Sequence, residues 1–230
     1  MGLRDRVLAT MKSRDTEGAF ELYVTRTPGY LWALLFRRLG VHPIAVTLAS
    51  IVIGAAAGYF FYFPSREMNL IGMLLLVWAN WYDCADGQLA RMTGKKTLIG
   101  RILDGFAGDV WFFCIYLAIA LRLTHAWTGL ADFMQHDTWV WALMAWAGLH
   151  CHSRQCALAD YYRNIHLWFL LGKQGSELDT SREEKREMES MRWLSRDWFH
   201  NLYLFFYIKY TRAQETQTPC FQQLYRLLQE

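Results

Sequence analysis

The sequence lacks the features of a secreted, disulfide-stabilised domain. Its five cysteines are an odd number spread over 230 residues, so we expect free thiols and not a disulfide framework. Residues 1–16 are charged along their length and contain no apolar signal-peptide segment. A myristoylation signal is also missing, because Arg6 stands where a Ser or Thr is required. The net charge of only +3 does not indicate a nucleic-acid partner.

Apolar residues are abundant, yet they are unevenly spread. They make up 53% of the chain, with 11 Trp, 12 Tyr and 14 Phe, but the mean hydropathy is only +0.04. A chain buried entirely in lipid would have a much higher mean value. The composition therefore indicates an apolar core joined to charged segments at both ends, with Trp and Tyr as anchors at a membrane interface.

Four segments predict membrane-spanning helices. Residues 44–63 contain no charge and have the ~20-residue length that a bilayer core requires. In this span Gly54 and Gly58 form a small-xxx-small pair, which permits close contact with another helix. The other three spans are expected from Leu70 to Arg91, from Ile99 or Ile102 to Leu123, and from Trp139 to about Tyr162.

Residues 30–39 predict an amphipathic helix in the membrane interface, just before the first span. Leu31, Leu34, Leu35 and Arg38 recur at i, i+3, i+4 and i+7, and Thr27-Pro28-Gly29 predicts a turn before them. Packing on a soluble domain is the alternative, but the span that follows directly favours the interface.

The expected fold is an all-α, polytopic integral membrane helical bundle with this N-terminal interfacial helix. Residues 1–41 are expected to form a cytoplasmic or interfacial N-terminal segment, and residues 42–172 a transmembrane catalytic domain of at least four spans. Residues 173–230 are expected to form a charged cytoplasmic or interfacial C-terminal segment. Lys and Arg gather before the first span and in the turn at 92–98, and residues 124–138 have none. The positive-inside rule therefore predicts a cytoplasmic N-terminus and a cytoplasmic 92–98 turn.

Four aspartates lie at the facing ends of the second and third spans: Asp83, Asp86, Asp104 and Asp109. A hairpin at 92–98 would put Asp86 and Asp104 at similar depth, each about five residues, or roughly 8 Å, below the helix ends. Carboxylates this close repel one another unless a cation lies between them, and oxygen-only ligands favour Mg²⁺ or Mn²⁺. Acids inside membrane segments usually mark a functional site.

The acids belong to a longer pattern, D-x2-D-G-x2-A-R-x8-G-x3-D. It comprises Asp83, Asp86, Gly87, Ala90, Arg91, Gly100 and Asp104. This pattern resembles the signature of the CDP-alcohol phosphotransferase family, which continues with x3-D. Here position 108 is glycine, and the next acid comes one residue later. The run LGVHPIAVTL within residues 38–63 is similar to bacterial phosphatidylinositol-phosphate synthases.

The resemblance implies a membrane enzyme of phospholipid synthesis at the cytoplasmic face of the cell (inner) membrane. Such an enzyme transfers a phospho-alcohol group from a CDP-alcohol to an acceptor hydroxyl and releases CMP. CDP-diacylglycerol is the favoured donor, and inositol phosphate or a similar polyol phosphate is the favoured acceptor. The resemblance also implies a homodimer among membrane lipids, two Mg²⁺ or Mn²⁺ ions held by Asp83, Asp86, Asp104 and Asp109, and nucleotide contacts from Gly87, Ala90, Arg91 and Gly100.

Asp109 is the expected catalytic residue, although its spacing is irregular. In a regular α-helix residues 104 and 109 are ~140° apart, whereas residues 104 and 108 are ~40° apart. A π-bulge within 105–108, eased by Gly105 and Gly108, would turn Asp109 toward the metals, and we predict such a bulge. The alternative is that Asp109 caps or pairs elsewhere and another group is the base.

Signals in the fourth span are weaker. Arg154 and Arg163, near its cytoplasmic end, predict contacts to an anionic acceptor, with ordinary positive-inside residues as an equal alternative. His152 and Cys156 share a helical face, but packing is favoured over a zinc site.

Competing functions also remain open at this point. They are the transfer of a CDP-linked polar headgroup to a lipid alcohol, divalent-cation transport through the same acids, and a non-catalytic membrane scaffold.

Overall fold

The computed structural model describes residues 2–11, 18–95, 97–126, 138–172, 176, 178, 180–190 and 198–228. All regular elements in these residues are helices, as the composition and periodicity predict. Internal contacts divide the chain into two compact units, Met1–Ser153 and Arg154–Glu230.

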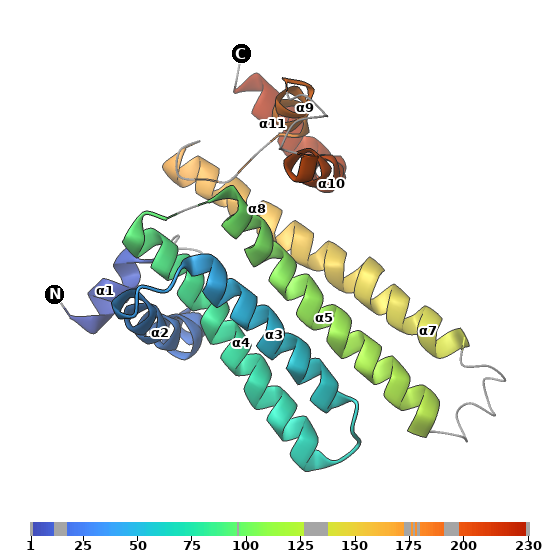
Figure 1. Cartoon of the computed structure of the whole chain (residues 1–230). Coiled ribbons are helices and arrows are strands. Elements are labelled where there is room, and N and C mark those ends of the chain that lie inside the picture. The colour runs from blue at the N-terminus through green and yellow to red at the C-terminus, as the bar shows by residue number, and fades with distance from the viewer. Residues whose placement is uncertain are drawn as a thin grey trace. The chain divides into compact units, whose positions relative to one another are not determined.

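Three long helices form the centre of the first unit: α3 (Pro43–Phe61), α4 (Arg66–Thr93) and α5 (Leu98–Ala126). They run alongside one another, and α3 packs against both α4 and α5 (Figure 1). Two further elements, α7 (Thr138–Ala145) and the π-helix η2 (Trp146–His152), pack against α5. The helix α3 therefore joins α4 and α5 into one bundle, because it packs against both of them.

Close contact between α3 and α5 depends on Gly54 and Gly58. A Cβ atom added at Gly54 would lie 2.1 Å from Cδ1 of Trp111, and one added at Gly58 would lie 2.9 Å from the carbonyl carbon of Cys114. Neither distance is possible for a real side chain, so the two helices approach as closely as they do because these positions have none. The predicted small-xxx-small contact is confirmed.

The outer surfaces of α3, α4 and α5 are apolar. In the described part of the chain, two helices are long and apolar enough to cross a membrane, Pro43–Phe61 and Leu103–Thr124. They correspond to the first and third predicted spans, and the second and fourth stay predictions. The helix α4 has 28 residues but carries charges at both ends, and it also exposes large apolar side chains: Leu70, Met73, Leu74 and Val77.

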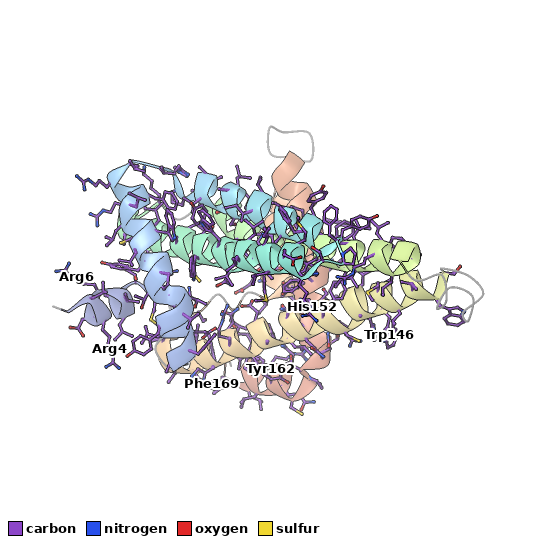
Figure 2. The ribbon with its side chains drawn as sticks, turned by 90° about the horizontal axis from the view of Figure 1, so that it is seen from below. Arg4, Arg6, Trp146, His152, Tyr162 and Phe169 are labelled. Atoms are coloured by element: carbon purple, nitrogen blue, oxygen red, sulfur yellow. The ribbon has the colours of Figure 1, made fainter. Side chains whose placement is uncertain are left out.

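The N-terminal segment lies at the end of the bundle where α4 ends and α5 begins (Figure 1). It contains α1 (Leu3–Ala9), the π-helix η1 (Glu21–Arg26) and α2 (Thr27–Arg38). Arg4 and Arg6 on α1 point away from the bundle (Figure 2). Val7, Leu22 and Tyr30 form a small buried core within the segment. This core packs α1, η1 and α2 against one another.

The predicted turn at Thr27-Pro28-Gly29 is wrong, because η1 continues directly into α2. Pro28 has no N–H to donate to the carbonyl oxygen of Val24 one turn earlier, and that oxygen accepts a hydrogen bond from Nε1 of Trp81 instead. Gly29 has a different role from the expected one. A Cβ atom there would lie 2.8 Å from Cβ of Cys84 and 3.3 Å from the carbonyl oxygen of Trp81, so glycine lets α2 touch α4.

A short connection joins α4 to α5, as the predicted hairpin requires. Gly94 ends α4 in the left-handed conformation, with φ 68°. The N–H of Gly100 donates to Oγ1 of Thr97 at 3.0 Å in the first turn of α5. These local caps reverse the chain between the two helices that carry the aspartates.

The second unit contains nearly all of α8 (Ser153–Leu171), together with α9 (Ser181–Ser190), α10 (Trp198–Gln217) and α11 (Pro219–Leu227). Its core consists of Tyr161, Ile165, Leu178 and Tyr225. The buried Glu184 accepts a hydrogen bond from Oγ1 of Thr211 at 3.0 Å, which links α9 to α10. The helices α9, α10 and α11 lie within the charged C-terminal segment expected at 173–230, of which residues 191–197, 229 and 230 lie outside the described residues.

The packing of Gly58 generates a stability prediction. Replacing Gly58 with Ala should destabilise the bundle by about 1–3 kcal/mol, because backbone atoms of Cys114 cannot move aside. Gly105→Ala is the matched control on α5: a Cβ atom there meets nothing within 4 Å, so the change should be neutral or stabilise the helix by up to ~1 kcal/mol. Thermal unfolding of the purified proteins in one detergent measures both. Equal melting temperatures for the two variants would contradict the close contact.

Candidate active site

Three of the predicted acids come together at the α4–α5 end of the first unit. Asp83, Asp86 and Asp104 each offer a carboxylate oxygen, and these oxygens lie within 4.8 Å of one another. Asp83 and Asp86 share a face of α4 because they are three residues apart. Asp104 reaches the same place from the first turns of α5. Asp86 is 4% exposed, Asp83 is half-buried and Asp104 is exposed, so the group opens to one side.

Asp86 is the most enclosed of the three. Its carboxylate contacts the side chain of Thr47 on α3 and the backbone N–H of Gly87. Its Oδ2 atom has no hydrogen-bond partner in the described residues. A buried carboxylate oxygen without a donor is costly unless something else binds it.

Each of the two aspartates on α4 interacts electrostatically with an arginine. Arg91, one turn after Gly87, interacts with Asp86, and Arg26 of η1 interacts with Asp83. Nε of Arg91 donates to the carbonyl oxygen of Thr10 at 2.5 Å, so the segment that follows α1 orients this arginine.

The residues expected to contact a nucleotide lie around this group. A Cβ atom at Gly87 would lie 3.4 Å from Nη1 of Arg91, so glycine leaves the guanidinium room to lie against the helix. Ala90 is half-buried on the same helix. Gly100 belongs to the capped first turn of α5, where a Cβ atom would lie 3.0 Å from Oγ1 of Thr97.

Asp109 does not join the three acids. The helix α5 is α-helical from Leu98 to Ala126, so the predicted bulge within 105–108 is wrong. One face of α5, with Asp104, Ala107 and Trp111, is directed toward α3 and α4. Asp109 lies on another face of α5. Phe112 and Tyr116 lie on that same face, and both pack against His152 of η2.

The irregular turn is instead found on the neighbouring helix. The π-helix η2 carries Trp146 and His152 (Figure 2), and the ring centroid of His152 lies 4.0 Å from that of Phe112. His152 also lies close enough to Asp109 to interact with it electrostatically. The shifted aspartate thus belongs to the seam between α5 and η2, which agrees with the alternative that it pairs elsewhere.

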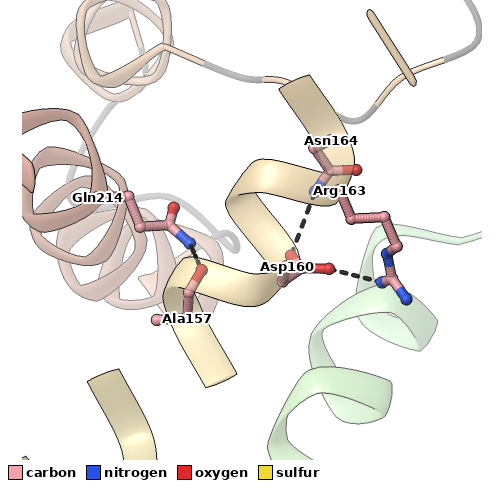
Figure 3. A network of polar contacts seen from close by, with 5 residues as sticks. All are labelled: Ala157, Asp160, Arg163, Asn164 and Gln214. Atoms are coloured by element: carbon pink, nitrogen blue, oxygen red, sulfur yellow. Dashed lines mark hydrogen bonds and ion pairs between the residues drawn. The ribbon is translucent and has the colours of Figure 1, made fainter. Parts of the chain in front are cut away.

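Arg154 and Arg163 belong to the second unit and have partners there. Nη2 of Arg163 lies 2.6 Å from Oδ1 of Asp160, and Nδ2 of Asn164 donates to Oδ2 of the same carboxylate at 3.2 Å (Figure 3). Nη2 of Arg154 donates to Oε1 of Gln217 at 3.1 Å. A role for either arginine in binding an acceptor stays a prediction.

The chain belongs to the CDP-alcohol phosphatidyltransferase family. Residues 40–162, more than half of the chain, match the sequence model of this family. The match includes the whole aspartate pattern and the helices α3, α4 and α5 that position it. No curated protein and no solved structure is similar enough to count as a match. The chain is therefore a membrane-embedded enzyme of phospholipid synthesis with CDP-alcohol phosphatidyltransferase activity.

Enzymes of this family use divalent metals, and the acids present fit such ions. The donor set consists of carboxylate oxygens alone, which suits Mg²⁺ or Mn²⁺ and disfavours zinc. Within the described residues, Asp83, Asp86 and Asp104 form a group of acidic side chains close enough together to hold a metal ion. His152 and Cys156 are not part of this group, and the ring of His152 packs on that of Phe112.

Sequence reasoning missed two residues at the site, Thr47 and Arg26. Thr47 lies within the run that resembles the family, so its position in that run was an available signal. Arg26 had no signal of its own: it is one of several arginines before the first span.

The separation of Asp109 from the other acids generates a second prediction. Asp86→Asn and Asp104→Asn should each weaken Mn²⁺ binding by at least tenfold. Mutating a residue that only hydrogen-bonds to a metal ligand already lowers metal affinity ~10–100-fold, and these changes alter the ligands themselves. Asp109→Asn should leave Mn²⁺ affinity within about twofold of the parent. Electron paramagnetic resonance titration of the purified proteins measures free Mn²⁺ directly. A loss in Asp109→Asn as large as that in Asp104→Asn would contradict the geometry.

Proposed function

We propose that the protein transfers a phosphatidyl group from CDP-diacylglycerol to the hydroxyl of a polyol phosphate such as inositol phosphate, and releases CMP. The observation that carries the proposal is the grouping of Asp83, Asp86 and Asp104 within 4.8 Å, on helices with apolar outer surfaces. A lipid donor and a water-soluble acceptor must meet at such a boundary. The run LGVHPIAVTL favours an anionic polyol as the acceptor.

The roles of the residues follow from their chemistry. Asp83, Asp86 and Asp104 would hold two divalent ions, which when bound would neutralise negative charge on the pyrophosphate of the donor. Arg91 is oriented by the carbonyl oxygen of Thr10, and its planar guanidinium suits a phosphate of the nucleotide. Gly87, Ala90 and Gly100 carry little or no side chain, so the nucleotide could approach the backbone of α4 and α5.

The base that takes the proton of the acceptor is the least conventional part of the site. At the position of the next family aspartate, Gly108, a Cβ atom would meet nothing within 4 Å. Asp109 lies on the α5–η2 seam, so we assign it no contact with the metals. The geometry therefore supports ion binding by Asp83, Asp86 and Asp104. We assign the removal of the proton from the acceptor hydroxyl to a group other than Asp109.

Ion transport is a weaker alternative for the same acids. A transport path needs polar groups at successive depths across the membrane. In the described residues, the metal-binding oxygens instead cluster in one place at the α4–α5 end of the bundle. A scaffold without activity and transfer of a polar headgroup to a lipid alcohol are left as outcomes of the assay.

The proposal predicts metal-dependent CMP release. The purified protein with Mg²⁺ or Mn²⁺ should release CMP from CDP-diacylglycerol in the presence of inositol phosphate, and the lipid product should carry the acceptor. Asp104→Asn should lose most of this rate, since it removes one ligand of the ion pair. A panel of acceptors, including glycerol phosphate and serine, identifies the substrate. Turnover of other CDP-alcohols alone would favour headgroup transfer, and no CMP release from any of them would favour the scaffold.

A glycine at position 108 predicts a gain of activity on substitution. Gly108→Asp should raise kcat, because a carboxylate would project into open space ~40° from Asp104 on the same helix. Positioned general bases contribute up to ~10²–10⁴-fold, so even partial alignment should be measurable. Gly108→Asn is the matched control, with the same shape and no basic carboxylate. Equal rates for the two variants would mean that proton removal does not limit the reaction.

A further inference from the structure

The backbone of η1 is fixed against α4 beside the acidic group. Nε1 of Trp81 donates to the carbonyl oxygen of Val24 at 2.8 Å, and Nε2 of Gln88 donates to the carbonyl oxygen of Arg26 at 3.2 Å. Trp81 and Gln88 precede and follow the two α4 aspartates in the sequence. The last residues of η1 are therefore held next to the helical turn that bears the site.

This attachment brings a second arginine to the acids. Arg26 is half-buried, and its guanidinium acts on the carboxylate of Asp83, as Arg91 acts on that of Asp86. Both cations depend on the N-terminal segment: Arg91 through the carbonyl oxygen of Thr10, and Arg26 because it is part of η1. The acidic group thus has two arginines close to it, both positioned by the N-terminal segment.

A guanidinium paired with a metal-binding carboxylate competes with the metal for that carboxylate. Once ions occupy the acids, a nearby arginine gains more by binding a new anion than by remaining with a neutralised one. The anion that would enter with the ions is a pyrophosphate. Arginine offers a planar set of N–H donors that matches phosphate oxygens, often with two parallel hydrogen bonds.

We propose that Arg26 binds a phosphate group of the CDP-linked substrate, and that η1 is a wall of the nucleotide site. The inference rests on the proposed function, because it takes the acids as an ion site for a CDP-linked donor. It assigns to the N-terminal segment a direct contact with substrate in addition to its expected place at the membrane interface.

A purely structural role for Arg26 predicts different behaviour. If its charge served only to hold η1 on α4, its loss would weaken ion binding, nucleotide binding and thermal stability together. A substrate contact predicts opposite effects: removing the competing charge leaves Asp83 easier for an ion to bind, while the phosphate loses a partner.

The test uses the full chain in detergent and compares Arg26→Gln, Arg26→Lys and the parent. Arg37→Gln is the matched control, since Arg37 is an exposed arginine at the end of α2. Electron paramagnetic resonance measures Mn²⁺ affinity without nucleotide, and calorimetry measures CDP affinity at saturating Mn²⁺. Arg26→Gln should bind Mn²⁺ at least as tightly as the parent and bind CDP about tenfold more weakly, the effect of one lost charge-assisted hydrogen bond. Arg26→Lys should recover part of the CDP affinity, and Arg37→Gln should match the parent in both measurements.

Three results would overturn the inference. Unchanged CDP affinity in Arg26→Gln would remove the substrate contact, and parallel loss of Mn²⁺ and CDP binding in both Arg26 variants would make the role structural. Weaker binding of inositol phosphate with unchanged CDP affinity would move Arg26 to the acceptor. A parent protein that binds CDP with Mn²⁺ but releases no CMP would refute the proposed function and leave this comparison intact.

Discussion

Mutual repulsion of three carboxylates is the constraint on which this structure depends. Asp83, Asp86 and Asp104 place oxygens within 4.8 Å of one another, and Asp86 is almost fully buried with one oxygen that lacks a partner in the described residues. Charges at such distances interact strongly wherever water is scarce. Cations close by relieve this repulsion: Arg26 and Arg91 interact with the two α4 aspartates, and the three carboxylates together could hold divalent ions.

The surrounding helices bring the acids together through unusually close contacts. Glycines on α3 allow α5 to approach its backbone, and Gly29 does the same between α2 and α4. The first contact sets where Asp104 lies relative to the α4 aspartates. The second brings the N-terminal segment to the same turn of α4, where it orients Arg91 and supplies Arg26. Glycine at these helix crossings thus serves the site as well as the bundle.

The face of α5 on which a residue lies decides whether it takes part in the site. Asp104 is on the face directed toward α3 and α4, whereas Asp109 is on the face that packs on η2 beside Phe112 and His152. Gly108, between these faces, looks onto open space. Asp83, Asp86 and Asp104 are therefore grouped and Asp109 is apart from them, within the residues 40–162 that match the family.

Local pattern was sufficient to predict the all-helical fold, the apolar helices α3 and α5, the α4–α5 hairpin and the grouping of three acids. Each follows from the 3.6-residue period, from the length of an apolar run or from the charged turn between two such runs, and all of these are features of neighbouring residues in the chain. The tertiary structure alone decided the straight course of α5 through residues 105–108, the helical conformation at Thr27-Pro28-Gly29 and the approach of Arg26 to Asp83. These depend on contacts between segments far apart in sequence, where a neighbouring helix and not the local spacing determines which conformation has the lowest free energy.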